Sequence, residues 1–413
     1  MCGICGVFYK EFTRKVDARL LERMCHTINH RGPDNRGIWV NGNIGFGHTR
    51  LSIIDLSTLG NQPMPNENQT VWVTFNGEIY NFLDIREYLI KKGHCFRSRT
   101  DTEVLVHLWE EEGVDCVKRL RGMFAFAVWD ETAKTLFLAR DRVGKKPLFY
   151  ANLADRFMFA SEIKAILQDP SFTKEVDVEA IHHYLSYQSV PSPHCAFKGV
   201  KKLPPAHYLL IKNGNEQPVC YWKLSYRDKL VVPDENALAS LQEEIIERLR
   251  EAVKIRLMSD VPLGAFLSGG IDSSIITALM AGLTNQPVKT FSIGFEHDEY
   301  NELSYARMVA ERYHTDHHEF IVKPEARTIF PELVWYYNEP FADSSAIPTF
   351  YVSKLAKQHV TVILNGDGGD ENFAGYPRYT NTGDYAVQPS VAYLLQRWLK
   401  QRSFHCRHRF RHQ

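Results

Sequence analysis

The chain has no excess of charge of either sign, no long apolar run and no secretion signal. Lysine plus arginine equals aspartate plus glutamate at 49 each, so the formal net charge is +0 and no overall basic field attracts nucleic acid or an anionic membrane. No uncharged apolar stretch reaches the roughly 18 residues that a bilayer span requires, and the first residues lack the pattern of a signal peptide. These absences predict a cytoplasmic protein whose partners are small molecules, with no nucleic acid and no membrane.

The eight cysteines are scattered along the chain rather than clustered. Such spacing is typical of free thiols in a reducing compartment. Cys2 and Cys5 form one C-x-x-C pair, and no second pair accompanies it, which argues against a zinc or redox site at that position.

The length of 413 residues predicts two or three domains, and 44% hydrophobic with 24% charged residues is typical of a soluble globular protein. The first half mixes short β patterns with helical ones, which predicts an α+β domain. Its expected helices are 83–92 and 103–112, and its expected strands, the last three of which resemble a meander, are 71–75, 124–129, 136–140 and 157–160. Prolines between 190 and 205 predict irregular structure and a linker region.

After Asp234 the pattern changes to alternating helices and strands. The expected helices are 235–258, 271–283 and 302–313, and the expected strands are 263–267, 288–295 and 360–364. This alternation predicts an α/β domain with a doubly wound parallel sheet. Residues 397–413 are basic and rich in histidine, and no acidic residue follows Asp384. We expect a solvated tail there, and a chain that is truncated or read in an altered frame.

Cys2 becomes the first residue if the initiator Met1 is removed. Its thiol and its α-amine then share one backbone unit, and an amine with a pKa of about 7.7–8.0 is partly neutral near pH 7 and can accept the thiol proton. A thiol is also a better nucleophile than a hydroxyl, because a small fraction is thiolate at neutral pH. The start of the chain therefore predicts a self-contained nucleophile for acyl transfer.

Three later segments carry groups that suit an amino-acid amide as substrate. Arg50, in H-T-R-L-S-I-I-D, has a planar fork that can bind a carboxylate. Asn76 and Gly77 follow a predicted strand, where a side-chain amide and a backbone N–H can stabilise an oxyanion. Asp101, in T-D-T-E, offers a carboxylate to a substrate ammonium. Together with Cys2, these groups predict a glutamine site.

Each segment also has a structural interpretation: Arg50 as a surface or ion-paired residue, Asn76-Gly77 as a hairpin turn, and Asp101 as a helix N-cap. The presence of all these segments, in this order along the chain, favours a catalytic role over the structural interpretations. The motifs C-G-I-x-G, R-G-P-D, H-x-R-L-S-I-x-D, N-G-E-I-Y-N and T-D-T-E all lie within residues 2–165. In this the chain resembles the class II glutamine amidotransferases, which are N-terminal nucleophile enzymes.

That resemblance implies an αββα sandwich in which Cys2 attacks glutamine and ammonia is released. It implies that Asn76 and Gly77 hold the oxyanion and that Arg50 and Asp101 bind the amino-acid end. The implied glutamine-binding residues are Arg50, Leu51, Ile53, Ile54, Asn76, Gly77, Glu78 and Asp101.

Two loops in the second half suggest nucleotide chemistry. The string L-S-G-G-I-D-S-S, Leu267–Ser274, lies between a predicted strand and a predicted helix, where glycines, serine hydroxyls and a helix N-terminus can bind phosphate. No Gly-Lys-Ser/Thr follows, so this is not a Walker loop, and Asp272 suits a divalent cation that bridges it to phosphate. The loop N-G-D-G-G-D-E, Asn365–Glu371, follows another strand and offers carboxylates for Mg²⁺.

The structural interpretations of these loops are a capped helix after a tight turn and a solvated acidic turn. The length of the first string, and the pairing of two loops with complementary chemistry, favour function. The first loop resembles the pyrophosphate loop of ATP pyrophosphatases. With the segments 291–295 and 338–345, the two loops resemble the synthetase domain of glutamine-hydrolysing asparagine synthetases over residues 235–380.

By this resemblance ATP is contacted by Leu267, Ile293, Asn365 and Gly366, and pyrophosphate is held by Ser268, Gly269, Gly270, Asp272, Ser273 and Ser274. Asp272 and Asp370 bind Mg²⁺, and Asp367 takes part in forming the acyl-adenylate. Two departures stand out. The family commonly has S-G-E-G where this chain has N-G-D-G, a carboxylate one methylene shorter, and its late lysine has no matching segment here.

We therefore expect a glutamine-dependent asparagine synthetase that uses ATP, Mg²⁺ and aspartate. The expected parts are a glutaminase domain at 2–195, a linker at 196–234, an incomplete ATP-pyrophosphatase domain at 235–384 and an atypical tail at 385–413. Two alternatives stay open: a related amidotransferase that acts on a cell-surface sugar or peptide carboxylate, and a truncated protein that retains only glutaminase or ligand binding. A homodimer is compatible with the expected asparagine synthetase.

Overall fold

The computed structural model describes residues 1–212, 217–227, 229–295, 301–323, 326–376 and 379. Contacts group the chain into two units, Met1–Tyr226 with Arg327–Ser344, and Arg227–Ala326 with Ser345–Gln413. The tail expected at 385–413 lies outside the described residues, and the domain boundaries expected from the sequence, except those of the linker, stay predictions. No helix of the described ranges is both long enough and apolar enough for a membrane span.

Two antiparallel six-stranded sheets form the first unit. One sheet has the order β10 (Val200–Lys202), β8 (Phe149–Asn152), β9 (Arg156–Ala160), β1 (Gly3–Tyr9), β3 (Ile44–Arg50), β2 (Asn35–Asn41). The other has the order β12 (Val219–Cys220), β11 (His207–Ile211), β7 (Thr135–Arg140), β6 (Gly122–Asp130), β5 (Val71–Ile79), β4 (Met64–Pro65).

The helices of this unit are α1 (Ala18–Thr27), α2 (Phe82–Lys91), α3 (Glu103–Glu112), α4 (Cys116–Arg119), α5 (Ile163–Ile166), α6 (Val178–Tyr187) and α10 (Ala326–Tyr337), which belongs to it from Arg327 on. Three short 3-10 turns lie at Asn29–Arg31, Thr58–Gly60 and Gly113–Asp115. In α1 the Asp17 side chain accepts from Arg19 N at 2.9 Å, and the apolar stripe of the helix is buried.

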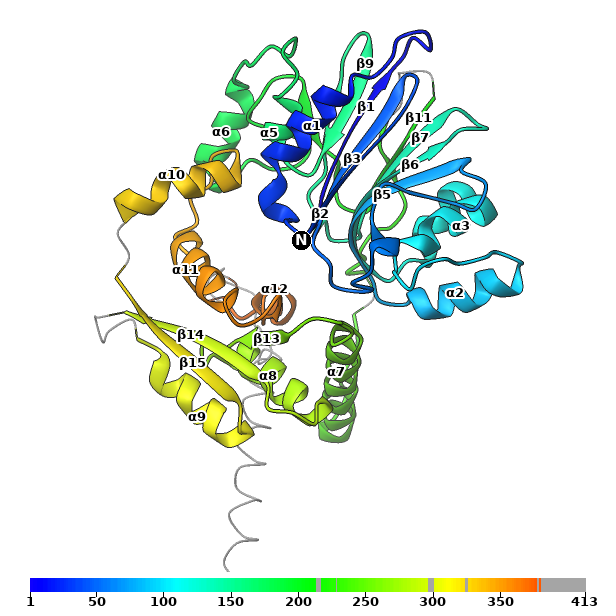
Figure 1. Cartoon of the computed structure of the whole chain (residues 1–413). Helices are drawn as coiled ribbons and strands as arrows, with labels where there is room; N and C mark the ends of the chain where they lie inside the picture. The colour runs from blue at the N-terminus through cyan, green and yellow to red at the C-terminus, as the bar shows by residue number, and fades with distance from the viewer. Residues whose placement is uncertain (213–216, 228, 296–300, 324–325, 377–378, 380–413) are drawn as a thin grey trace, which may run out of the picture. The chain divides into compact units, whose positions relative to one another are not determined.

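The two sheets pack face to face and helices cover their outer faces (Figure 1). Ile4 and Phe46 from one sheet share a buried cluster with Ala125 and Trp129 from the other. On the far side of the first sheet, Val7 packs with residues of α1 and α5, while α2 and α3 lie over the second sheet. This is the αββα arrangement that the resemblance implied. Because both faces of β1 and β3 are covered, every residue of these strands is buried.

Two expectations for this half were wrong. β6 and β7 are neighbours as predicted, but β9 lies in the other sheet between β8 and β1, so the three strands are not a meander. The free edge of β7 is instead occupied by β11. Residues 196–234 were expected to form a linker, yet they contribute β10, β11 and β12 to the two sheets. The prolines interrupt the chain only briefly, and both sheet edges remain available for pairing.

The second unit contains a parallel sheet, as predicted, with the order β15 (Asp316–Val322), β14 (Lys289–Phe295), β13 (Leu263–Phe266), β16 (Val362–Leu364). Its helices are α7 (Glu235–Arg256), α8 (Ile271–Leu283), α9 (Leu303–Tyr313), α11 (Ala346–Ala356) and α12 (Gly369–Phe373). Ala265 packs with residues of α7 and α8, and its neighbour Phe266 packs with residues of α11. Since consecutive strand residues face opposite ways, helices cover both faces of the sheet.

The strand order reverses at β13, whose neighbours are β14 on one side and β16 on the other. Ligands of open parallel sheets bind at the carboxyl ends of the strands at such a reversal. The loop Leu267–Gly270 follows β13, and the loop Asn365–Gly368 follows β16. The topology therefore places both predicted nucleotide loops at this point.

Candidate functional site

The Cys2 side chain is partly buried against the backbone of Leu51, just beyond the end of β3. Leu51 N donates to Cys2 Sγ at 3.4 Å, and Sγ donates to Leu51 O at 3.6 Å. Burial raises the pKa of the thiol above its ordinary value of 9.0, although the terminal amine, the Leu51 N–H and Lys146 act to lower it. The thiol is therefore protonated at neutral pH and requires a base before it can attack.

His48 lies near this position and is not such a base. It is fully buried, and its Nε2 donates to Phe75 O at 3.1 Å. Burial lowers the pKa of His48 to about 3, with a further contribution from the Arg50 charge. His48 is therefore neutral, and its role is to tie β3 to β5 at the residue before Asn76.

Arg50 is buried, so its interpretation as a surface residue is wrong. Its Nη1 donates to Ser57 O at 2.7 Å and to Asn61 Oδ1 at 3.0 Å, and its Nη2 donates to Asp55 O. The guanidinium packs on Gly60, where a Cβ atom would lie 2.1 Å from Nη2. These contacts fix the fork and leave part of it for a ligand.

Asn76 and Gly77 lie inside β5, opposite Ala125 and Phe124 of β6, so they do not form a hairpin turn. The Asn76 side chain is fully buried, and neither Oδ1 nor Nδ2 has a hydrogen-bond partner. A buried amide left unpaired costs roughly 1–3 kcal/mol, so this arrangement favours a bound group that completes it. A Cβ atom on Gly77 would lie 2.2 Å from Met123 O, so only glycine fits there.

Asp101 is buried, and its Oδ2 accepts from Ile79 N at 2.9 Å at the end of β5. It does not cap α3, whose N-cap residue is Thr102. Burial raises the pKa of Asp101 to about 7, and the nearby Glu78 charge acts in the same direction. A substrate ammonium would favour the charged form.

The loop after β3 completes the surroundings of Cys2. Asp34, from the R-G-P-D motif, accepts from Ser52 N at 2.7 Å and holds the loop in place. The predicted contact residues Leu51, Ile53 and Ile54 are partly buried in it. Gln62 connects this loop to β5 and to the N-terminus of α3. Its Oε1 accepts from Phe75 N at 2.7 Å, and its Nε2 donates to Thr102 Oγ1 at 3.1 Å.

The charges of these groups act on one another. The pKa of Arg50 is lowered by burial, while Cys2, Asp55, Asp34 and Asp101 oppose that shift electrostatically. Cys2, Arg50 and Asp101 therefore lie close enough for their charges to interact.

Lys146 is a neighbour of Cys2 that the sequence interpretation missed. It is buried, whereas Lys145 beside it is exposed. The Asp141 carboxylate accepts hydrogen bonds from the backbone of the turn that follows it, including one from Lys146 N at 3.0 Å. The Lys146 side chain points inward from this turn, and its Nζ lies 2.8 Å from Met1 Sδ. Burial lowers the pKa of Lys146 to about 8. No pattern in the sequence distinguishes the two lysines.

A charge network positions the backbone of Cys2. Arg31 Nε donates to Cys2 O at 2.9 Å, and Arg31 Nη1 lies 2.9 Å from Glu162 Oε1. Glu162 also contacts His30 Nε2 at 2.9 Å and Lys164 Nζ at 2.8 Å. Burial alone would raise the pKa of Glu162, but these three partners lower it to about 2.

In the second unit, the predicted phosphate loop is held by hydrogen bonds among its own residues. Gly269 has φ +85, a conformation that favours glycine, and the N-cap of α8 is Gly270, which has no side-chain cap. Ser268 Oγ lies 3.0 Å from Ser273 Oγ, and Ser274 Oγ donates to Gly270 O at 2.6 Å. The serines therefore shape the loop rather than cap the helix.

The second loop packs directly against the first. A Cβ atom on Gly366 would lie 2.8 Å from Asp272 Cβ, and one on Gly369 would lie 2.2 Å from Asp272 Oδ2. Burial raises the pKa of Asp272, and the Asp370 and Glu371 charges raise it further. Three carboxylates that repel one another in this way suit a divalent cation.

Two cavities flank the Ser268–Ser274 loop. One, of about 250 Å³, is mainly apolar and is lined by Leu267, Ser268 and Ile293 among others. The other, of about 140 Å³, is lined by Asp272, Asn365, Gly366 and Asp367 among others. In the second cavity Asn365 Nδ2 donates to the exposed Asp367 at 2.7 Å. The predicted nucleotide residues thus divide between an apolar pocket and a polar one.

Comparison with known proteins agrees with both halves. Residues 1–222 match the family model described as glutamine amidotransferase domain, and residues 244–411 match the model described as asparagine synthase. The chain is 39% identical over 383 residues to asparagine synthetase [glutamine-hydrolyzing] 1 of Bacillus subtilis, with 92% of this chain and 59% of the relative covered. It is 38% identical over 406 residues to a putative asparagine synthetase [glutamine-hydrolyzing] 2 of Methanocaldococcus jannaschii, with 92% and 76% covered.

Among solved structures, a glutamine phosphoribosylpyrophosphate amidotransferase from B. subtilis aligns with TM-score 0.40 and 16% identity, covering 79% of this chain and 70% of that one. This likeness is too weak to support an argument about function. The identity and coverage of the M. jannaschii relative, and a family model that matches more than half of the chain, are sufficient for a family assignment. The chain belongs to the family of glutamine-hydrolysing asparagine synthetases.

Proposed function

We propose that this protein hydrolyses glutamine and uses the ammonia to amidate aspartate, which it activates with ATP as β-aspartyl-AMP. The observation that carries the proposal is the convergence of Cys2, Arg50 and Asp101 in one unit and of two phosphate-type loops in the other. The chain spans 59% of the length of the B. subtilis relative and 76% of that from M. jannaschii, so activity is for experiment to establish.

In the glutaminase half, we assign Cys2 as the nucleophile once Met1 has been removed. The α-amine then takes the thiol proton, sulfur bonds to the side-chain carbonyl carbon of glutamine, and the leaving nitrogen takes up the proton and departs as ammonia. Water then hydrolyses the thioester to glutamate. The buried, unpaired amide of Asn76 supports a role, with Gly77 N–H, as oxyanion donor.

Arg50 and Asp101 would bind the α-carboxylate and α-ammonium of glutamine. Leu51, Ile53, Ile54 and Glu78 would complete the glutamine pocket. Arg31 holds the Cys2 carbonyl in place, and the Lys146 ammonium lowers the pKa of the thiol, so both act as positioning residues.

In the synthetase half, the apolar pocket at Leu267 and Ile293 suits the adenine ring of ATP. Asn365 and Gly366 would contact the same nucleotide. The pyrophosphate would lie on the loop of Ser268, Gly269, Gly270, Asp272, Ser273 and Ser274.

The aspartate carboxylate would attack the α-phosphorus of ATP and displace pyrophosphate, with Asp367 close to the reacting groups. Asp272 and Asp370 would hold Mg²⁺, which supplies charge neutralisation for the phosphates when bound. Ammonia would then displace AMP from the acyl-adenylate and give asparagine.

The cysteines of the described residues are all free, which supports a cytoplasmic location as part of this proposal.

The test is to measure glutamate release from glutamine and pyrophosphate release with ATP and aspartate. Cys2→Ala should lose glutamine hydrolysis and keep ammonia-dependent asparagine formation. Asp272→Asn should lose pyrophosphate release and keep glutamine hydrolysis. Glutamine hydrolysis by Cys2→Ala at the wild-type rate contradicts the nucleophile. Pyrophosphate release with another carboxylate acceptor but not with aspartate identifies a different amidotransferase.

A further inference from the structure

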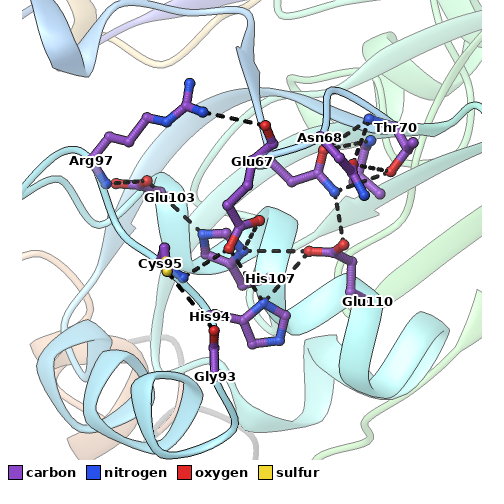
Figure 2. Close-up of polar contacts among 12 residues, drawn as sticks. Glu67, Asn68, Thr70, Gly93, His94, Cys95, Arg97, Glu103, His107 and Glu110 are labelled. Carbon is purple, nitrogen blue, oxygen red and sulfur yellow. Dashed lines mark hydrogen bonds and ion pairs between the residues drawn. The ribbon is translucent and has the colours of Figure 1, made fainter.

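A cluster of two histidines and two glutamates lies at the edge of the first unit. Glu67 comes from the loop between β4 and β5, His94 follows α2, and His107 and Glu110 occupy one face of α3 (Figure 2). One ligand atom of each side chain lies within 4.8 Å of all the others. Three segments that are distant in the sequence therefore point potential metal ligands at one position.

The distances fit a small tetrahedral ion. His107 Nδ1 lies 3.4 Å from Glu67 Oε2 and 3.4 Å from Glu110 Oε2. His94 Nδ1 lies 3.7 Å from Glu110 Oε2 and 3.9 Å from Glu67 Oε1. Zinc bonds to nitrogen and oxygen of about 2.0–2.1 Å place tetrahedral ligands about 3.3–3.4 Å apart. Of the six edges of such a tetrahedron, the two from His107 to the glutamates are close to this length, and the two from His94 are about 0.3–0.6 Å longer.

Both imidazoles present the correct nitrogen. His94 Nε2 lies 3.2 Å from Glu111 Oε1, and His107 Nε2 lies 3.9 Å from Glu103 Oε1. A metal-bound histidine usually directs its other ring N–H at a carboxylate, which fixes the tautomer and orients the ring. Glu111 is such a partner for His94, whereas the 3.9 Å separation leaves His107 Nε2 without a hydrogen bond. In both rings Nδ1 is the atom that faces the other residues of the cluster, so it is the nitrogen that would bind the ion.

The two carboxylates are held in the same way. Glu110 Oε1 accepts from Asn66 Nδ2 at 2.7 Å, and Glu67 Oε1 accepts from Cys95 N at 2.8 Å. Each glutamate is thus oriented by a donor outside the cluster, which a chance gathering of surface acids does not require.

The two histidines of the cluster are sheltered from solvent. The His107 side chain is 1% exposed and that of His94 is 13% exposed, while Phe96 packs edge-on against the His107 ring with centroids 4.6 Å apart. A bound divalent cation would balance the charge of the two carboxylates. Because the site is partly buried, this neutralisation stabilises the protein more than it would in water.

We propose that Glu67, His94, His107 and Glu110 form a structural zinc site. Four protein ligands leave no open position for substrate, which is the arrangement of structural rather than catalytic zinc. None of the four belongs to the proposed glutamine or nucleotide machinery. The ion would join the start of β5, the end of α2 and the middle of α3, the helix that follows Asp101.

The test uses the full chain, stripped of metal with EDTA, dialysed and reloaded with Zn²⁺. Metal content by mass spectrometry should reach one zinc per chain, and titration calorimetry should give one tight site. His94→Gln and Glu67→Gln, each of which removes one proposed ligand, should each weaken Zn²⁺ binding by about 100-fold or more. Glu111→Gln, which removes only an outer partner, should weaken it by about 10-fold, within the range known for such partners.

The matched control is His183→Gln, in a second group formed by Glu179, His183 and His194 that offers only three ligands. This variant should keep the tight site. Co²⁺ should give the visible bands of a tetrahedral ion without a thiolate charge-transfer band, since no cysteine is a ligand. Circular dichroism establishes that each variant folds. Absence of tight zinc in the wild type, its loss in His183→Gln, or its survival in both His94→Gln and Glu67→Gln would each overturn the proposal.

Discussion

Replacing Asn76 by alanine should separate activity from stability. The Asn76 amide is fully buried, and neither of its polar atoms has a hydrogen-bond partner. A buried amide in this state costs roughly 1–3 kcal/mol of stability, which Asn76→Ala would recover. The same substitution opens a small cavity, which lowers stability. We expect the free energy of unfolding of this variant to lie within about 1 kcal/mol of the wild-type value.

Activity should respond very differently. If the Asn76 amide donates to the oxyanion, its loss should lower kcat for glutamine hydrolysis by about 10²–10³, which corresponds to about 2.7–4 kcal/mol of transition-state stabilisation. KM for glutamine should change little, because the oxyanion develops only in the transition state.

The assay combines initial rates of glutamate release with urea unfolding of the same preparations. Asn43→Ala is the matched control. Asn43 is also buried, but its Nδ2 donates to Tyr9 O at 2.7 Å, at the end of β1 opposite to Cys2. We expect this control to lose about 1 kcal/mol of stability and to keep its kcat.

Two results would contradict the proposed role of Asn76. A loss of more than about 3 kcal/mol of stability in Asn76→Ala would mean that the amide supports the fold rather than a ligand. A fall in kcat of less than about tenfold would mean that it is not an oxyanion donor.

Three further predictions concern charged groups. Lys146→Met should move the rising limb of the rate–pH profile for glutamine hydrolysis to higher pH, because the Lys146 ammonium lowers the pKa of Cys2, whereas Lys145→Met should leave the profile unchanged. Protonation of Asp101, with a pKa of about 7, should lower kcat/KM for glutamine as pH falls below 7, and Asp101→Asn should remove this dependence; an unchanged profile would rule out the ammonium contact. The pKa of Glu162 is lowered from 4.5 to about 2, so its ion pairs stabilise the fold fully above pH 4.5. About 3 kcal/mol of the free energy of unfolding should be lost as pH falls towards 2. Urea unfolding of Glu162→Gln should lack this loss.

Elements with a strong local pattern could be predicted from the sequence. The helices at Glu103–Glu112 and Ile271–Leu283 were predicted with the bounds that the structure shows. A helix satisfies its backbone hydrogen bonds within one segment, so its periodicity and ends are local properties. β1 and β3 escaped prediction because both of their faces are buried and the alternation of polar and apolar residues is missing.

The motifs identified much of the candidate site because their residue types carry distinct chemistry. A cysteine behind the initiator methionine, an arginine fork and a carboxylate in T-D-T-E suggest an amino-acid amide wherever they lie in the chain. The partner of β9, by contrast, depends on which sheet edge is free once all strands have paired. Sheet neighbours are set by long-range contacts, so the local sequence leaves them open.

The residue types and their order along the chain were enough to predict the family and to propose a nucleophile, substrate-binding groups and two phosphate loops. Which of two adjacent lysines lies buried close to Cys2 became visible only in the fold, because the burial of Lys146 depends on the turn around Asp141. Only the tertiary structure joined Glu67, His94 and the His107-Glu110 pair into one cluster. Residue types and local spacing are properties of a short segment, whereas burial and convergence arise from the packing of segments that lie far apart in the chain.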